Sequence, residues 1–312
     1  MTRKTYTKAR YIKLGERGGW EQHCLEEGIA PLAYYDVPHD MALSGNREAI
    51  RKVYLDLGKT AGTATGHAGQ LLSFYDPDPD VLWITFSGGS LWWAEFAPEV
   101  EYLGSDPEQY PQGSRFRRTT SGWHKVSFTG TPLLIGELSG NLTKVAAYQG
   151  TICTLKPDQL DYLMRKLRDE DLPEVRAAQA ARKRLLATTE EVIRLLTWQD
   201  FELFTELLFS RSGWQRISSL GGTQKTLDLE LLLPTTGERA IVQVKSATSQ
   251  AQLDDYIGRF GAMAADKYFY VYHTSKQDLD PRDSGILLMG ASALADQALK
   301  SGLVDWLITK AA

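Results

Sequence analysis

The chain has 312 residues and a formal net charge of −4, and 43% of its residues are hydrophobic and 24% charged. This length allows two domains with cores of their own, and the composition is ordinary for a globular protein. The charge excludes an overall basic field, although local patches can still bind nucleic acid. Cys24 and Cys153 form no CxxC pair and predict neither a disulfide framework nor a zinc site. No apolar run approaches the roughly 18 residues that span a bilayer, so we expect a cytoplasmic protein without a membrane partner.

Residues 1–155 are predicted to form an aromatic-rich α+β domain with a barrel-like sheet. The strand-like runs are VLWITF, SLWWAEF, WHKVSFTG and TICTL, separated by PDPD, SGG and TGT. EQHCLEEG and REAIRKVYLDLG are typical of short helices. GKTAGTATGHAG lacks the first glycine of a phosphate-binding loop, because position 53 is Val. We interpret it as a flexible loop able to close over a small ligand.

A basic segment at 114–125, SRFRRTTSGWHK, carries four cations and no acid. Its cations are Arg115, Arg117, Arg118 and Lys125. Basic residues interleaved with aromatic and hydroxyl side chains suit phosphate contact combined with stacking on bases. The alternative is a solvated loop whose aromatics anchor it to the core.

Three segments resemble the small PUA-like and EVE-like reader domains in spacing and in the placement of aromatic residues. They are FYDPDPDVLWITFSGGSLWW, SGWHKVSFTGTPLL and LSGNLTKVAAYQGTIC. In modification-dependent restriction systems such domains are fused to nucleases. The resemblance implies an aromatic cage around a base flipped out of double-stranded DNA. The candidates for this cage are Trp83, Trp92, Trp93, Trp123 and Tyr75. Alternatively, most of these tryptophans belong to the core, which is the commoner location of a tryptophan.

Residues 156–196 are predicted to be a helical connector, rich in helix formers and free of glycine. Pro157 and Pro173 suit first-turn positions, so we expect two helices that break near Asp171 and Leu172. The basic run at 182–184 is interpreted as a solvated face. The segment is expected to space the two domains, and it is a candidate dimer contact.

Residues 197–312 are predicted to form an α/β domain with element order αβββαβ(β)α and a mostly buried mixed sheet. The helix FELFTELLF follows a capping box that begins at Thr197. WQRISSLGG, the hairpin at 226–245, KYFYVYHTS and ILLMG are predicted strands. SQAQLDDYIGRFGAMAA and ASALADQALKSGLVDWLIT are predicted helices.

The hairpin TLDLELLLPTTGERAIVQVK places leucines on one face and polar residues on the other. If the turn is centred between Thr236 and Gly237, Asp228 lies opposite Lys245, and Glu230 lies opposite Gln243. Four polar groups then share one face. A structural interpretation is a cross-strand Asp–Lys pair, which is worth about 0.2–1 kcal/mol.

The run F-E-x-F-x-x-L-L, G-W, G-G, L-D-L and V-Q-V-K resembles the Mrr-like branch of the PD-(D/E)XK nucleases over residues 197–275. The resemblance implies a restriction-endonuclease-like core. By position it makes Glu202 the helix glutamate, Asp228 the strand aspartate, and Gln243 and Lys245 the terminal motif. The chain departs from the family's usual G-D-x-G-I-D run, because GTQKTLD stands before the strand.

Phosphodiester hydrolysis needs charge stabilisation and a positioned water, and these residue types supply both. Asp228, the Gln243 carbonyl and Glu202 are expected to hold Mg²⁺, or Mn²⁺, through oxygen ligands. Lys245 is expected to orient or deprotonate the attacking water. Glu230 is a spare carboxylate on the same face.

These features predict a Mg²⁺-dependent DNA endonuclease, of the modification-dependent restriction kind, that acts as a homodimer on double-stranded DNA with modified bases. One alternative is a defence nuclease that acts on RNA or branched DNA. Another is a nucleic-acid-binding protein with weakened catalysis, because Gln243 replaces the superfamily's usual glutamate and the extra acidic residue of the G-D-x-G-I-D run is missing. A third, a small-ligand sensor in the N-terminal domain, rests on the glycine-rich segment at 58–69.

Overall fold

The computed structural model describes residues 5–217, 228–260 and 263–312. The chain divides into two compact units, unit 1 (Met1–Asp171) and unit 2 (Leu172–Ala312). The expected connector at 156–196 is therefore shared between them. Helix α6 (Pro157–Leu167) packs its leucines into the core of unit 1, whereas α7 (Pro173–Leu195) packs against the last two helices of unit 2. Both helices begin at the predicted prolines.

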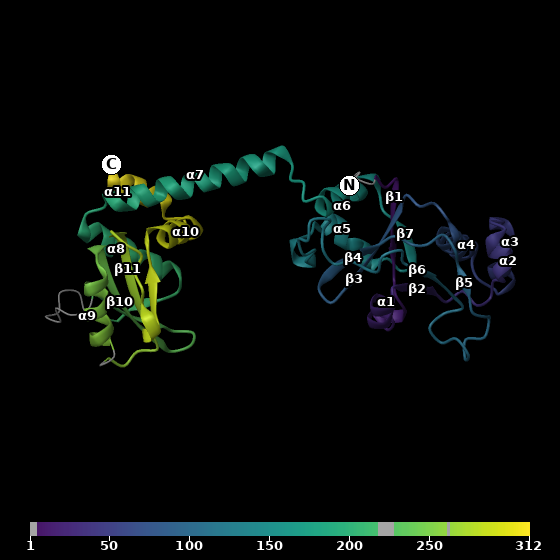
Figure 1. Cartoon of the computed structure of the whole chain (residues 1–312), viewed down its shortest axis with the longest axis horizontal. Helices are drawn as coiled ribbons and strands as arrows, with labels where there is room; N and C mark the ends of the chain where they lie inside the picture. The colour runs from purple at the N-terminus through teal and green to yellow at the C-terminus, as the bar shows by residue number, and fades with distance from the viewer. Residues whose placement is uncertain (1–4, 218–227, 261–262) are drawn as a thin grey trace. The chain divides into compact units, whose positions relative to one another are not determined.

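Unit 1 combines short strands with short helices (Figure 1). Its strands are β1 (Lys8–Ile12), β2 (Ile29–Leu32), β3 (Val81–Ser87), β4 (Ser90–Ala94), β5 (Glu101–Tyr102), β6 (Arg115–Arg118) and β7 (Ile152–Thr154). Its α-helices before α6 are α1 (Glu21–Glu27), α2 (His39–Leu43), α3 (Arg47–Asp56), α4 (Ala61–Tyr75) and α5 (Gly140–Thr143). Single 3₁₀ turns lie at η1 (Glu16–Gly18), η2 (Ile135–Glu137) and η3 (Lys144–Ala147).

The strands of unit 1 form two open sheets, in the orders β4-β3-β1-β7 and β2-β6-β5. The prediction of a barrel-like domain is wrong, because a barrel pairs every strand on both sides and each of these sheets ends in edge strands within the described residues. The expected strand in WHKVSFTG is also absent. Only isolated bridges occur there, such as the pair Trp93 and His124.

The segment interpreted as a flexible glycine-rich loop is instead helix α4. Thr60 caps it by accepting a hydrogen bond from the Thr63 amide. Ala64, Ala68, Leu71 and Phe74 recur at helical spacing and are buried in the unit 1 core. Tertiary burial of this stripe outweighs the low helix propensity of the glycines.

Unit 2 is a mixed α/β structure, as predicted (Figure 1). After α7 come α8 (Trp198–Arg211), β8 (Gln215–Arg216), β9 (Leu229–Leu233), β10 (Glu238–Thr248), α9 (Gln250–Phe260) and β11 (Lys267–Ser275). The chain ends with η4 (Arg282–Ser284), β12 (Ile286–Met289), α10 (Ala291–Ser301) and α11 (Val304–Ala311). The single terminal helix expected here is two helices, because Gly302 adopts φ 70° at the end of α10.

The sheet of unit 2 has the order β12-β11-β10-β9-β8. Strands β10, β11 and β12 are parallel, while β8, β9 and β10 are joined in antiparallel pairs. Residues of α7, α8, α10 and α11 cover one face, and residues of α9 cover the other. Leu229, Leu231, Val242 and Val244 point to the first face, so the opposite side chains of β9 and β10 are left to face α9.

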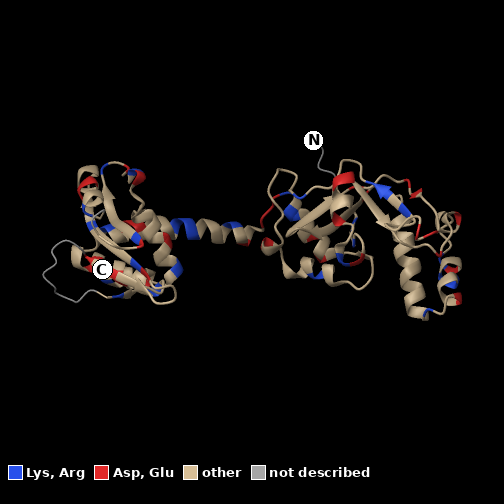
Figure 2. Cartoon of the chain, turned by 90° about the horizontal axis from the view of Figure 1, so that it is seen from below, with Lys and Arg blue, Asp and Glu red and all other residues tan. Residues whose placement is uncertain are grey.

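The basic run at 182–184 is exposed, as predicted, and Arg182 pairs with Asp296 at 2.8 Å. Lys and Arg recur along α7 (Figure 2). No helix in the described ranges is both long and apolar enough to span a membrane.

Candidate active site

The predicted site residues of unit 2 converge around the start of β9 and the middle of β10, but in a different register from the expected one. Glu230 pairs with Ile241, where Gln243 was predicted. The turn is centred one residue earlier, between Thr235 and Thr236, because Leu233 pairs with Glu238 and the Gly237 amide donates to the Leu233 carbonyl at 2.8 Å. The register is thus two residues from the predicted one. A shift of two residues leaves every side chain on its original face, so the polar face survives the error.

Asp228 is anchored by the neighbouring strand. Its Oδ2 accepts a hydrogen bond from the Val244 amide at 2.6 Å and another from the Gln243 side-chain amide. Burial raises the pKa of the Asp228 carboxyl above its ordinary value, although the Val244 amide, the Lys245 charge and the Gln243 amide each oppose the rise. The site therefore holds a carboxyl whose negative charge is incompletely compensated.

Gln243 is buried, with 1% of its surface exposed. Its amide nitrogen donates to Asp228, whereas its carbonyl Oε1 is buried and has no hydrogen-bond partner among the described residues. Buried acceptors are nearly always satisfied, and an unsatisfied one calls for an explanation such as a bound ion or water. The Gln243 Oε1 atom is thus available as a ligand for a cation next to the Asp228 carboxyl.

Glu202, in the second turn of α8, lies near enough to interact with this pair. Burial is the main cause that raises the pKa of Glu202, and the Asp228 charge raises it further. Lys245 and Arg216 act in the opposite direction. Helix α8 packs on β10, which brings a helix carboxyl to the strand carboxyl. The electrostatic interactions of Glu202 with Asp228 and Lys245 join these three residues, which we call the cluster.

Lys245 lies two residues after Gln243 on β10, so the two side chains are on the same face of the strand. Its Nζ is 5.4 Å from the centroid of the Tyr256 ring on α9. A cation over an aromatic face is held in place without being neutralised. The ammonium therefore stays available to a phosphate or water.

Three neighbours of the site escaped the sequence reasoning: Arg216, Tyr256 and Tyr270. Arg216 on β8 pairs with Glu206 at 2.7 Å and influences Glu202. Tyr270 is paired with Gln243 across the parallel strands, and its hydroxyl lies 2.5 Å from that of Thr248. The alternation of KYFYVYHTS already put tyrosines on one strand face, and this was the available signal.

Glu230, the predicted spare carboxylate, is engaged elsewhere. Its Oε1 accepts a hydrogen bond from the Arg239 guanidinium at 2.5 Å. We therefore separate it from the cluster of Asp228, Glu202 and Lys245.

The cluster was tested for its fit to a divalent cation. Among the described residues no group of three or more His, Cys, Asp or Glu side chains gathers at one point. Here the Asp228 carboxyl is hydrogen-bonded to the Gln243 amide, whose oxygen has no partner among the described residues, and the charge of Asp228 acts on the Glu202 carboxyl. Hard oxygen ligands in small number are what Mg²⁺ takes, because it keeps several of its waters. The donor set fits Mg²⁺, with Asp228, Glu202 and Gln243 as the residues that would hold it.

The predicted phosphate-binding residues of unit 1 do not form a basic surface. Arg115 and Arg117 are 0% and 1% exposed, so the prediction that they contact phosphate is wrong. Arg115 donates to the carbonyls of Tyr34 and Val37 at 2.8 and 2.7 Å. Their positions i and i+2 on β6 put both side chains on the inner face, where backbone carbonyls satisfy them.

Arg117 makes the same kind of contacts, donating to the carbonyls of Phe74, Asp76 and Ala97. Arg118 is exposed but pairs with Glu101 at 2.6 Å. Lys125 lies over the Trp92 ring, at 5.5 Å from its centroid.

The predicted aromatic cage does not form. Trp83 is 1% exposed and stacks on Phe96, with ring centroids 4.7 Å apart. Trp123 is buried, and its indole donates to the Ile29 carbonyl. The core interpretation is the correct one for these two rings.

The remaining cage candidates are also committed to packing. Trp92 packs against one hydrophobic core of unit 1 and Trp93 against the other. The Tyr75 hydroxyl accepts a hydrogen bond from Arg115 and contacts His39. These rings are structural parts of the fold.

Comparison with known proteins gives no relative for this chain: no protein family, no curated protein and no solved structure matches it.

Proposed function

We propose that unit 2 is a Mg²⁺-dependent phosphodiesterase that cleaves DNA internally. The observation that carries the proposal is the cluster of Glu202, Asp228 and Lys245 beside the unpartnered carbonyl of Gln243. The resemblance of this segment to the Mrr-like nucleases points to the same residues. As part of this proposal, unit 2 has a restriction-endonuclease-like core.

The protein groups divide the work by charge. Mg²⁺, when bound, offsets negative charge on the phosphate oxygens and supplies bound water. Asp228 and Glu202 position that ion, and their incompletely compensated charge favours a cation over a neutral ligand. Lys245, held over Tyr256, orients the attacking water and stabilises charge that develops on the phosphate.

The buried amide of Gln243 orients Asp228 through its nitrogen, and its oxygen would be a ligand for the cation. This arrangement explains how an amide can stand where the PD-(D/E)XK superfamily usually has glutamate, the variant that is typical of the Mrr-like branch. Two carboxylates beside each other would repel more strongly, and one amide relieves that repulsion.

The target of the proposed nuclease is duplex DNA, and cleavage of both strands requires two copies of the site. We expect a homodimer on DNA for that reason. The proposal does not include base reading by the predicted cage, because its tryptophans are packed into the cores.

A plasmid digestion tests the proposal. Wild-type protein is incubated with unmodified and cytosine-modified supercoiled plasmid in Mg²⁺ and, separately, in excess chelator. We expect nicked and linear DNA only with the metal, and a loss of about 10²–10⁴-fold in rate for Lys245→Ala with binding retained. Glu230→Gln is the matched control, since Glu230 lies on β9 and pairs with Arg239. Inertness towards both plasmids at high enzyme concentration refutes the DNA nuclease.

Structured RNA and branched DNA, assayed in parallel, decide between this proposal and its nearest rival. If only structured RNA or only branched DNA is cleaved, that substrate is the target instead of the DNA duplex. Binding without cleavage of any substrate favours a catalytically inactive binding protein.

A further inference from the structure

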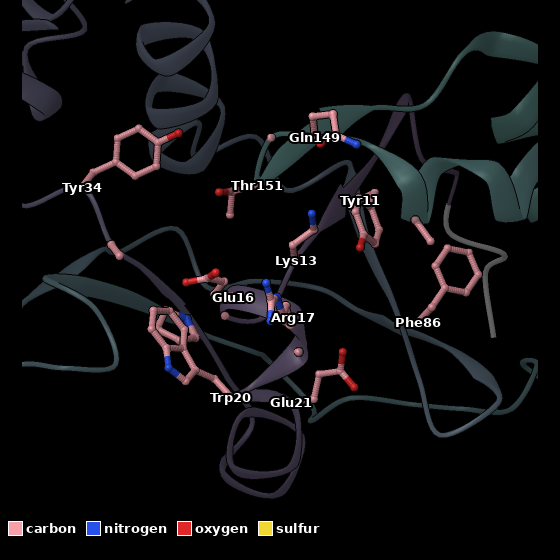
Figure 3. Close-up of a pocket in the computed structure, with 16 residues that line it drawn as sticks. Tyr11, Lys13, Glu16, Arg17, Trp20, Glu21, Tyr34, Phe86, Gln149 and Thr151 are labelled. Carbon is pink, nitrogen blue, oxygen red and sulfur yellow. The ribbon is translucent and has the colours of Figure 1, made fainter. Parts of the chain in front are cut away.

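Unit 1 contains a cavity of about 830 Å³ that the sequence did not reveal (Figure 3). Its walls come from the loop after β1, from residues 31–34 around the end of β2, from β3, and from the segment 146–151 before β7. In the close-up, Lys13, Glu16, Arg17 and Thr151 lie between Trp20 and Tyr34 on one side and Tyr11 and Phe86 on the other. Its size falls within the range of about 300–1,000 Å³ that holds small ligands.

The aromatic side of the cavity is held firmly. Gly15 has φ 83°, and a Cβ on it would come within 2.7 Å of the Trp20 ring, so the indole rests directly on this backbone. The Tyr34 hydroxyl lies 3.3 Å from His67 Nδ1. The ring faces are therefore preorganised before any ligand arrives, which reduces the entropy cost of binding.

The part of the cavity wall at residues 150–151 is fixed by the buried side-chain amide of Gln70. Gln70 Oε1 accepts hydrogen bonds from the Thr151 and Ile152 amides at 2.6 and 2.9 Å. A Cβ at Gly150 would approach this same amide to within 2.8 Å. The backbone of Thr151, one of the lining residues, is thus fixed just before β7.

Two cations line the cavity from the β1 end. Lys13 Nζ lies 3.0 Å from the Tyr148 carbonyl, an interaction that leaves its positive charge uncompensated. Arg17 is exposed and adopts φ 52°, in the left-handed region that costs a non-glycine residue roughly 1–2 kcal/mol. Strain of this kind persists where the surroundings impose it and is common at ligand sites.

Two carboxylates, Glu16 and Glu21, complete the charged lining. A ligand must therefore offer both an anion and hydrogen-bond donors, together with a flat ring for the aromatic faces. An apolar ligand would make no polar interaction with these four charged groups, and inorganic phosphate would leave the aromatic rings without a stacking partner. No acidic cluster for a metal occurs among the described residues.

A nucleotide meets all these requirements, and we propose that this cavity binds one. Its phosphate is placed at Lys13 and Arg17, and its base stacks on Trp20. The carboxylates of Glu16 and Glu21 accept hydrogen bonds from the donors of the base and sugar. The nucleotide is either free or one residue of a nucleic-acid strand. The site lies wholly in unit 1, and its occupancy does not depend on cleavage by unit 2.

Titration calorimetry on the full chain in the absence of divalent metal tests the proposal. The probes are deoxycytidine and deoxyadenosine 5′-monophosphates, the corresponding nucleosides, inorganic phosphate, and a short single-stranded oligonucleotide. We expect a mononucleotide or the oligonucleotide to bind, and the nucleosides and phosphate to bind at least about tenfold more weakly than the corresponding nucleotide.

The variants Lys13→Gln and Arg17→Gly each remove one cation, and glycine also suits the left-handed backbone at position 17. Each is expected to weaken binding about tenfold or more. Lys8→Gln is the matched control, because Lys8 lies at the start of β1, outside the cavity, and pairs with Asp78. Its affinity should equal that of the wild type.

Displacement of the oligonucleotide by a mononucleotide identifies a strand residue as the ligand, and binding of mononucleotides alone identifies a free nucleotide. Both results support the site. Absence of binding by all nucleotide probes at millimolar concentration overturns it, as does equal affinity in Lys13→Gln, Arg17→Gly and the wild type. Plasmid cleavage is measured separately, so failure of either proposal leaves the other standing.

Discussion

Replacement of Asp228 by Asn distinguishes two roles for this residue, that of an active-site carboxyl and that of a partner in a structural ion pair. Asn retains an oxygen that can accept from the Val244 amide and the Gln243 side chain, the two donors that bind Asp228 Oδ2. The substitution removes a buried charge whose burial raises the pKa of the carboxyl. Relief of an unfavourable functional residue typically stabilises a protein by about 0.5–2 kcal/mol. Each 1 kcal/mol corresponds to a rise in Tm of about 2–4 °C in a domain of this size.

The size of this gain depends on pH with a definite sign. The pKa of Asp228 is raised from 3.8 in the folded protein, so the folded state holds its proton to higher pH than the unfolded chain. The stability that this proton confers is fully present below the ordinary Asp pKa and is lost as the pH rises through the folded pKa. The wild type and Asp228→Asn should therefore melt alike near the ordinary Asp pKa and separate towards neutral pH. Glu202, whose pKa is also raised, keeps part of the pH dependence in the variant.

Thermal melts over this pH range, without divalent metal, measure the effect, and plasmid cleavage is measured on the same samples. We expect Asp228→Asn to melt higher near neutral pH and to cleave about 10²–10³-fold more slowly. Mg²⁺ at a hundred times Kd should stabilise the wild type by about 2.7 kcal/mol and so raise its Tm, and it should raise the Tm of the variant less. A variant that melts lower than the wild type near neutral pH would show that Asp228 stabilises the fold as an ion pair, and would refute this reasoning.

Three further changes probe other parts of the structure. Gln243→Glu places a second carboxylate against Asp228, so it should lower the Tm without metal near neutral pH and strengthen Mg²⁺ binding, as melts with and without Mg²⁺ will show. Arg115→Lys removes a buried guanidinium that donates to two backbone carbonyls, so denaturant unfolding should show a loss of about 2–4 kcal/mol, with DNA affinity of the folded protein unchanged. Gly302→Ala introduces a side chain at φ 70° and should cost about 1–2 kcal/mol in a thermal melt without affecting cleavage.

The elements of unit 2 could be predicted from the sequence because its burial pattern is regular. KYFYVYHTS is strand β11 from its first residue to its last, and α8 contains the whole of FELFTELLF. WQRISSLGG contributes β8 at Gln215–Arg216, and part of it, like the start of the predicted hairpin strand at 226–227, lies outside the described residues. Strands between two helical layers carry continuous apolar runs that local patterns reveal.

The predicted register of the hairpin was wrong, yet its polar residues keep the predicted strand face, and the two outcomes have different causes. Turn geometry sets register, and PTTG allows more than one turn centre. Side-chain alternation sets the face, and it is unchanged by a shift of two residues. Prediction of a polar cluster on a hairpin is therefore more robust than prediction of its cross-strand pairs. The contribution of Glu202 needed the resemblance, because no local pattern links a helix residue to a strand face.

The arginines of β6 were assigned wrongly because their sequence context is ambiguous in physical terms. A segment of arginine interleaved with aromatic residues suits a nucleic-acid surface and also suits a core in which guanidinium groups satisfy inward-facing carbonyls. The alternation offers a distinction: Arg115 and Arg117 share one strand face, while Phe116 and Arg118 occupy the other. Net charge does not decide between the two, because a buried guanidinium with enough carbonyl acceptors needs no acidic partner. Basic residues that recur with period two inside a strand should therefore be tested as core residues before they are assigned to phosphate.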